Sequence, residues 1–146
     1  MTRLEDTHIE NRQRVQPNHA NNYGTVHGGN VMKWMDEIGA MSAMRLAGET
    51  CVTANIDEMD FIRPVPVGDT VLVESYVYDT GRTSVKVRLR ASREEPRTGE
   101  RERTTESRFV FVAIGDDGTP VEVPDLQVET DEERRLQQEA LDAAGE

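Results

Sequence analysis

The stretch VMKWMDEIGAMSAMRLAG, residues 31–48, decides the fold of this 146-residue chain. Its residues favour a helix over 31–47, and Gly48 is a good C-terminal stop. At about 100° per residue, apolar and small side chains cover most of the helix circumference. A helix that is apolar nearly all round must be enclosed by the rest of the chain.

Runs of β-branched residues follow this helix and predict strands. Their short connections favour an antiparallel sheet, because parallel neighbours would need crossover helices. Residues 1–16 add one weak edge strand. The predicted strands after the helix are CVTANIDEMDFI (51–62), TVLVESYVYD (70–79), SVKVRLRAS (84–92) and ERTTESRFVFVAI (102–114).

A sheet of about five strands can enclose the helix only by curling around it. The first predicted strand supports a curved sheet, because its apolar positions 52, 54 and 56 change phase to 59 and 61. That change predicts a bulge near Asp57 and Glu58. The predicted fold class is therefore α+β: a single hotdog domain, in which a curved antiparallel sheet wraps a long central helix.

The hotdog domain is expected to span residues 1–124, with an acidic C-terminal extension over 125–146. In the extension, Thr130 and Glu133 have capping-box spacing and predict a short acidic helix. Either the extension packs between protomers or it stays loose. It carries more than half of the formal net charge of -11.

The charge and composition exclude several classes of protein. A net charge of -11 argues against a nucleic-acid partner, because a surface that follows phosphates has to be basic. The sequence has neither an apolar run long enough for a membrane span nor a signal peptide, so we expect a cytoplasmic protein. Lys33 and Lys86 are its only lysines. An acidic, lysine-poor surface is typical of a halophilic protein, although an acidic mesophilic protein would also fit.

Asp36 is an unusual residue for such an apolar helix. Its neighbours three, four and seven positions on are Gly39, Ala40 and Ala43, so it lies at the head of a groove of small side chains. Small residues either let another backbone approach closely or leave a channel for a slender ligand. A solvated surface carboxylate is the alternative interpretation, but this helix has little exposed edge.

The loop before the helix adds a second feature. Gly28 and Gly29 leave unobstructed backbone N–H groups at the positive end of the helix, where the first donors lack intrahelical partners. Such an end can polarise a carbonyl oxygen or hold an oxyanion. Together with a carboxylate about two turns further on, it predicts a hydrolytic site on one rigid element.

Three segments resemble the cytosolic acyl-CoA thioesterases of the hotdog superfamily, the brain acyl-CoA hydrolase type and its bacterial relatives. They are NNYGTVHGGNVMKWMDEIGAMSAMRLAG (21–48), VTANIDEMDFIRPVPVGDTVLVESYV (52–77) and GRTSVKVRLRA (81–91). The similarity runs from about Asn18 to Ile114. It implies hydrolysis of a fatty acyl-CoA thioester by an Asp of one protomer and an Asn of the facing protomer.

The resemblance also implies roles for individual residues. Asp36 matches the family's helical Asp, acting as a general base or as the nucleophile. Asn21 matches the loop Asn, with Asn22 as the adjacent alternative. His27, Met32 and Arg63 are expected along the substrate path, with Arg63 at a CoA phosphate. The pantetheine and nucleotide path is expected to run along Gly81, Arg82, Thr83 and Ser84.

Neither a metal nor an organic cofactor is expected, since His8, His19 and His27 form no recognisable ligand set. The single Cys51 cannot form an intramolecular disulfide and is read as a small strand residue. The family implies a homo-oligomer, with a dimer as the minimum and a hexamer as the expected assembly. Two alternative functions remain: a hotdog hydratase or dehydratase that uses His27, and a non-catalytic acyl-CoA binding or sensing module.

Overall fold

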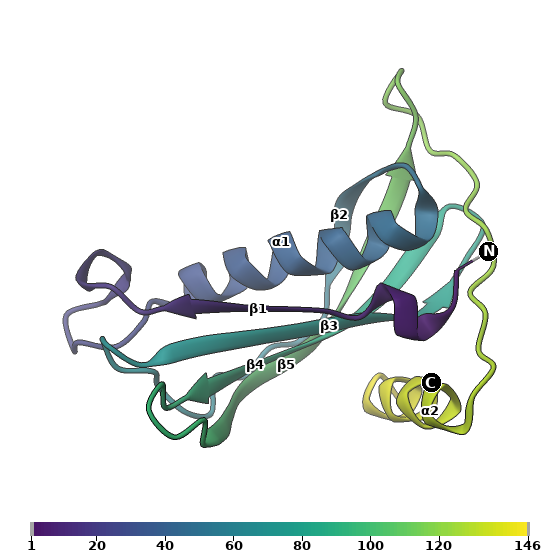
Figure 1. Ribbon diagram of the computed structural model, residues 1–146. Helices are drawn as coiled ribbons and strands as arrows, with labels where there is room; N and C mark the ends of the chain where they lie inside the picture. Colours follow the sequence, from purple (N-terminus) through teal and green to yellow (C-terminus); the bar gives the residue numbers. More distant parts are fainter. Residues whose placement is uncertain (1, 146) are drawn as a thin grey trace.

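The computed structural model describes residues 2–145, which form one curved sheet with a long helix on one side and a short helix on the other (Figure 1). The sheet has five strands in the order β1-β3-β4-β5-β2, and each neighbouring pair is antiparallel. This is the predicted hotdog architecture. The elements are β1 (Ile9–Arg14), α1 (Gly28–Ala47), β2 (Thr50–Ile56), β3 (Thr70–Thr80), β4 (Ser84–Glu94), β5 (Arg101–Ile114) and α2 (Asp131–Ala143), with 3-10 helices at Leu4–Thr7 and Pro17–His19.

The long helix α1 begins earlier than predicted, because the first turn closes on His27. The carbonyl oxygen of His27 accepts hydrogen bonds from Asn30 N (3.0 Å) and Val31 N (3.3 Å), which places Gly28 and Gly29 inside the first turn. The predicted stop is confirmed: Gly48 is left-handed, with φ 66°, and its N–H binds Met44 O. No helix among residues 2–145 is long and apolar enough to cross a membrane.

The main core lies between α1 and the concave face of the sheet. Alternate residues of β3, β4 and β5 point toward the helix, as period-two strands require. The helix contributes a stripe of large side chains that includes Met35 and Leu46. The buried strand residues of this core include Val73, Val77, Val87, Leu89, Phe109 and Phe111.

The first strand after the helix differs from the prediction in length and in the position of its bulge. β2 ends at Ile56 rather than continuing to residue 62, and the register shift against β5 falls between Thr53 and Asn55. Beyond Ile56 the chain is held to β5 only at intervals, by Asp57 N to Arg108 O (3.0 Å) and Ile62 N to Thr104 O (2.9 Å). The predicted bulge near Asp57 and Glu58 is therefore wrong.

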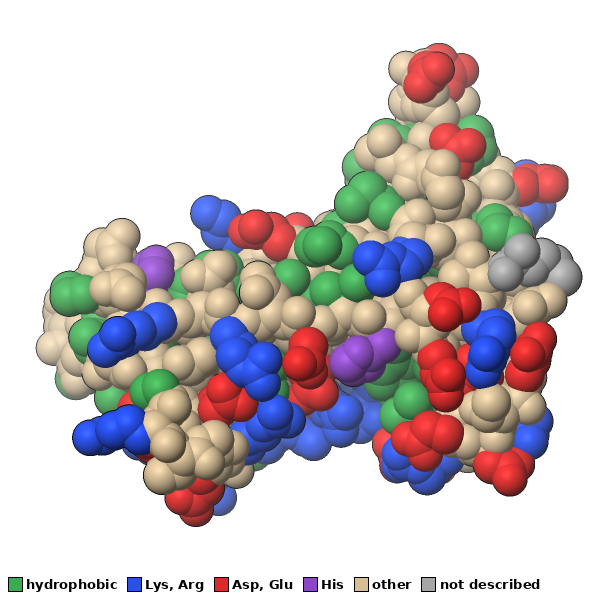
Figure 2. All heavy atoms as spheres, viewed as in Figure 1, with side chains coloured by type: hydrophobic (Ala, Val, Ile, Leu, Met, Phe, Trp, Pro, Cys, Tyr) green, Lys and Arg blue, Asp and Glu red, His purple; other side chains and the backbone are tan. Residues whose placement is uncertain are grey.

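The helix is less enclosed than its composition predicted. Met41 is 45% exposed, and Met32 and Met44 are exposed to a similar degree. Figure 2 shows hydrophobic side chains at the surface beside α1, whereas the side of the sheet nearer α2 is dominated by charged groups. The reason is geometric: five strands curl around only part of the helix, and β2 ends the sheet as an edge strand.

The C-terminal helix α2 packs on the convex face of the sheet (Figure 1). The predicted capping box is present between Thr130 and Glu133. Tyr76 of β3 donates its hydroxyl to Leu136 O (2.8 Å), and Gln137 donates to Tyr78 O (3.1 Å). The acidic extension is thus docked on its own chain rather than loose.

Candidate active site

The helical carboxylate is held by a residue of the neighbouring edge strand. Asp36 is partly buried, and its Oδ1 accepts a hydrogen bond from Thr53 Oγ1 of β2. Thr53 faces α1 because it lies opposite Phe111, a core residue of β5. The bond fixes the carboxylate and leaves Oδ2 available for water or substrate.

Among the small residues that follow Asp36, Gly39 allows the sheet to pack closely against α1. A Cβ at Gly39 would lie 3.1 Å from Leu89 and 3.2 Å from the ring of Phe111. Ala43 is fully buried in the same core. Small side chains were expected either to allow close approach of another segment or to leave a channel for a ligand. At Gly39 the structure shows close approach of the sheet.

The N-terminus of α1 opens beside a cavity of about 330 Å³. The walls include Gly28, Phe61, Arg63 and Thr104, which come from the helix, from the segment after β2 and from β5. A Cβ at Gly28 would lie 3.4 Å from the ring of Phe61, whereas at Gly29 it would meet nothing within 4 Å. The first-turn N–H groups therefore border a hollow of the size that small ligands occupy.

Two of the predicted substrate residues border this region with exposed side chains. Arg63 is 58% exposed and lies 3.8 Å from Glu102, a loose ion pair that leaves its guanidinium accessible. His27 is exposed and caps α1 through its backbone rather than its side chain.

The loop before α1 is organised by Asn21, not by Asn22. Asn21 Oδ1 accepts hydrogen bonds from Tyr23 N (2.9 Å), Thr25 N (3.3 Å) and Thr25 Oγ1 (3.2 Å). This turn occupies the amide oxygen and leaves Nδ2 as the group of Asn21 that can serve a ligand. Within one chain Asn21 faces its own loop, while Asp36 faces β2.

A single chain does not bring the predicted nucleotide path to the cavity. Residues 81–84 form the turn between β3 and β4, at the end of the sheet opposite to the start of α1 (Figure 1). Gly81 N donates to Ser84 O (2.9 Å), and Thr83 O accepts from Ala113 N (3.0 Å). Arg82 is 77% exposed and pairs only loosely with Glu122. Within one chain these residues therefore lie away from the cavity at the start of α1.

A larger hollow of about 540 Å³ lies between the end of β1, residues 67–69 and residues 95–97. It contains none of the predicted site residues. Its charged walls are partly occupied, because Arg97 pairs with Glu95 at 2.9 Å. We therefore centre the site on Asp36 and the start of α1.

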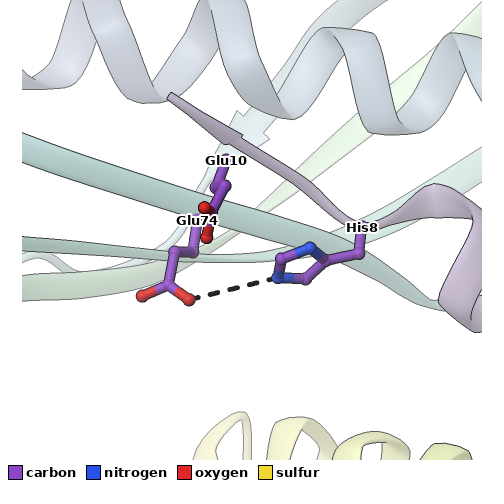
Figure 3. A group of neighbouring side chains, drawn as sticks. All are labelled: His8, Glu10 and Glu74. Carbon is purple, nitrogen blue, oxygen red and sulfur yellow. Dashed lines mark ion pairs between the residues drawn. The ribbon is translucent and has the colours of Figure 1, made fainter. Parts of the chain in front are cut away.

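One group of side chains among residues 2–145 is placed to share a cation, and it lies away from this site. His8, Glu10 and Glu74 bring their ligand atoms within 4.8 Å of one another on the side of the sheet facing away from α1 (Figure 3). His8 and Glu74 approach to 4.0 Å, which joins the segment before β1 to β3. The group has no connection to Asp36.

Sequence reasoning missed Thr53, Phe61 and Thr104. Thr53 was overlooked because the apolar alternation through Val52 suggested the opposite face of the strand. In the structure Val52 pairs with Val112 on the convex face, and Thr53 points to the helix. The orientation of Thr53 could have been predicted only by placing the bulge of β2 between Thr53 and Asn55.

The start of α1 can polarise a carbonyl oxygen, and Asp36 on the same helix can act as a base, so the two form the layout of a hydrolytic site. The sequence model of the "Thioesterase superfamily" matches residues 23–100. The chain is 38% identical over 141 residues to the uncharacterized acyl-CoA thioester hydrolase YkhA of Bacillus subtilis, covering 97% of this chain and 82% of that one. The chain belongs to the thioesterase superfamily.

Solved structures agree with this assignment. A hexameric acyl-CoA thioesterase superposes with a TM-score of 0.88 at 38% identity, covering 98% of this chain and 92% of that one. The acyl-CoA hydrolase of Staphylococcus aureus, in complex with butyryl coenzyme A, coenzyme A and coenzyme A disulfide, gives a TM-score of 0.88 at 28% identity, covering 99% and 88%. Structures of its variants with an aspartate, an asparagine or a threonine changed to alanine are similar to this chain as well.

Proposed function

We infer that this chain hydrolyses acyl-CoA thioesters to a free carboxylic acid and CoA. The observation that carries the inference is the pairing of Asp36 with Thr53, about two turns beyond the open N-terminus of α1. The aspartate, asparagine and threonine substituted in the Staphylococcus aureus hydrolase stand at the same intervals along its chain as Asp36, Asn21 and Thr53 here.

In the reaction that we propose, the thioester carbonyl oxygen lies against the first-turn N–H groups of Gly28 and Gly29. These donors and the helix dipole stabilise the negative charge that develops on this oxygen. Asp36 either removes a proton from the attacking water or attacks the carbonyl carbon itself, which gives a mixed anhydride that water then hydrolyses. The C–S bond breaks, and the thiolate of CoA leaves and takes up a proton.

The site is completed across a dimer in this proposal. Asn21 of the facing protomer supplies Nδ2, which is the part of its side chain that its own loop does not use. Residues 81–84 reach the CoA moiety only from another copy, since they lie at the far end of the sheet. Met32 and its exposed neighbours on α1 become buried between protomers or against the acyl chain.

The proposed assembly is a hexamer built from such dimers, in keeping with the hexameric relatives. Light scattering at low and molar salt tests this assembly. An active monomer would contradict the shared site.

We place the protein in the cytoplasm. Activity that rises in molar salt would support the halophilic interpretation of its acidic surface.

The decisive experiment measures release of CoA thiol from short, medium and long acyl-CoAs. Asp36→Asn keeps the shape of the side chain but removes its charge, so the rate should fall by at least about 100-fold. Glu37→Gln, an exposed neighbour on the same helix, is the matched control and should retain the rate. Turnover that survives Asp36→Asn would contradict the mechanism, and saturable binding without thiol release would indicate a binding module.

A further inference from the structure

His19 lies between the turn that carries Asn21 and the helix that carries Asp36. Its ring contacts the ring of Trp34 of α1 at right angles, with 5.1 Å between the ring centroids and an interplanar angle of 86°. Trp34 is buried and precedes Asp36 by two residues. Perpendicular aromatic pairs are favourable beyond the area that they bury. The side chain of His19 therefore fastens the loop before α1 to the helix.

Hydrogen bonds hold both the ring and the backbone of His19. Its Nδ1 accepts a hydrogen bond from Gln16 N (3.0 Å), so the neutral ring carries its proton on Nε2. Its carbonyl oxygen accepts from His27 N (2.9 Å) and from Asn30 Nδ2 in the first turn of α1 (3.0 Å). His19 thus joins the loop to α1 at two places, which are the first turn and Trp34.

The turn that follows His19 is closed by its own hydrogen bonds. Asn21 N donates to Thr25 O (2.8 Å), in addition to the bonds that Asn21 Oδ1 accepts. Gly24 O accepts from Val67 N (3.0 Å), which attaches the turn to the segment before β3. His19 adds the attachment to α1. The place of Asn21 relative to α1 is therefore set at His19.

We propose that His19 is a positioning residue that sets the place of Asn21 in the active site of the facing protomer. The inference rests on the proposed thioesterase function with its shared site, and deepens it by linking the two sites of a dimer. In that function Asp36 acts in the site of its own protomer, whereas Asn21 of the same chain acts in the other site. The contacts of His19 with α1 therefore fix the amide of one site relative to the carboxylate of the other.

Substitutions of two histidines test the contacts of His19. His19→Ala removes the ring and its acceptor, so kcat/KM for acyl-CoA should fall about 10-fold as Asn21 loses its fixed place. His19→Asn keeps an acceptor near the place of Nδ1 but loses the contact with Trp34, so the rate should fall less. This variant replaces His19→Ala if the latter does not fold. His8→Ala, on the side of the sheet facing away from α1, is the matched control and should retain the rate.

Mixed oligomers show which of the two sites His19 serves. Protomers with an intact Asp36 are co-expressed with a large excess of Asp36→Asn protomers, so that most intact protomers face an Asp36→Asn partner. The active site that remains in such a dimer takes its asparagine from the Asp36→Asn chain. His19→Ala on that chain should therefore lower the activity per intact Asp36, whereas His19→Ala on the intact chain should leave it unchanged. A merely structural role in α1 would give the reverse result, and an equal loss from either chain would also refute the proposal.

Asn21→Ala in the same mixtures separates this proposal from the thioesterase function itself. If Asn21→Ala lowers the activity from the Asp36→Asn chain and His19→Ala does not, the shared site stands and only the role of His19 fails. If neither acts from that chain, the shared site and the role of His19 both fail, while thiol release by the wild type would still support hydrolysis. A wild type that releases no thiol would overturn the proposed function and the role of His19 with it.

Discussion

One buried carboxylate contributes to the docking of α2, and its replacement gives a sharp prediction. Glu133 is 0% exposed, and its Oε2 accepts a hydrogen bond from Glu5 N (3.0 Å). Its Oε1 accepts from Thr130 N (3.0 Å), Glu129 N (3.1 Å) and Arg3 Nη2 (3.2 Å). This carboxylate thus joins the N-terminal segment to the start of the C-terminal helix.

The pKa of Glu133 gives the size of its contribution. Burial alone would raise the pKa, but the backbone N–H groups and Arg3 outweigh it and lower the pKa from 4.5 to about 2. That difference corresponds to about 3 kcal/mol of unfolding free energy at neutral pH. Because the folded-state pKa is lowered, this stability is fully present above pH 4.5 and is lost as the pH falls toward 2.

Glu133→Gln keeps the volume of the side chain but removes its charge and turns an N–H group toward backbone donors. We expect the free energy of unfolding to fall by about 3 kcal/mol at pH 7, and by about half of that at pH 3. Urea unfolding followed by circular dichroism, at one protomer concentration, measures both values.

Glu132→Gln is the control for this prediction. Glu132 is the preceding residue, is half exposed and pairs with Arg135 on the surface, so its loss should cost less than 1 kcal/mol. Equal stability of the two variants at pH 7 would refute the reasoning. So would a Glu133→Gln deficit that does not shrink in acid.

Three further predictions concern the core and the site. Gly39→Ala adds a Cβ between the buried side chains of Leu89 and Phe111, so we expect thermal unfolding to show a loss of about 1 kcal/mol despite the better helix propensity of alanine. Thr53→Val removes the donor to Asp36, the proposed catalytic carboxylate, and should lower kcat/KM roughly 10- to 100-fold in the CoA-release assay, with the fold intact by circular dichroism. Burial, with a smaller effect of a neighbouring carboxylate, raises the pKa of Cys51 to about 11, so a thiol reagent at pH 8 should label the native protein far more slowly than the urea-unfolded protein.

The local part of the fold could be read from the sequence. The presence of α1 and its end at Gly48 followed from the sequence, although its first turn was missed, and the cap of α2 followed from Thr130 and Glu133, because these signals act over one turn of helix. Short connections between β-branched runs were enough to predict an antiparallel sheet. The candidate carboxylate Asp36 stood out for the same reason, as a charge on an otherwise apolar helix.

The tertiary structure alone decided which side chains meet this carboxylate. One extra residue in β2 sets whether Thr53 faces the helix or the convex side, and a bulge at that place leaves no clear mark in the sequence. The approach of Phe61 and Thr104 to Gly28 depends on contacts between segments that are distant along the chain. The sequence by itself therefore determined most of the elements and the helix that carries the candidate carboxylate, whereas register and long-range packing determined the walls of the candidate site.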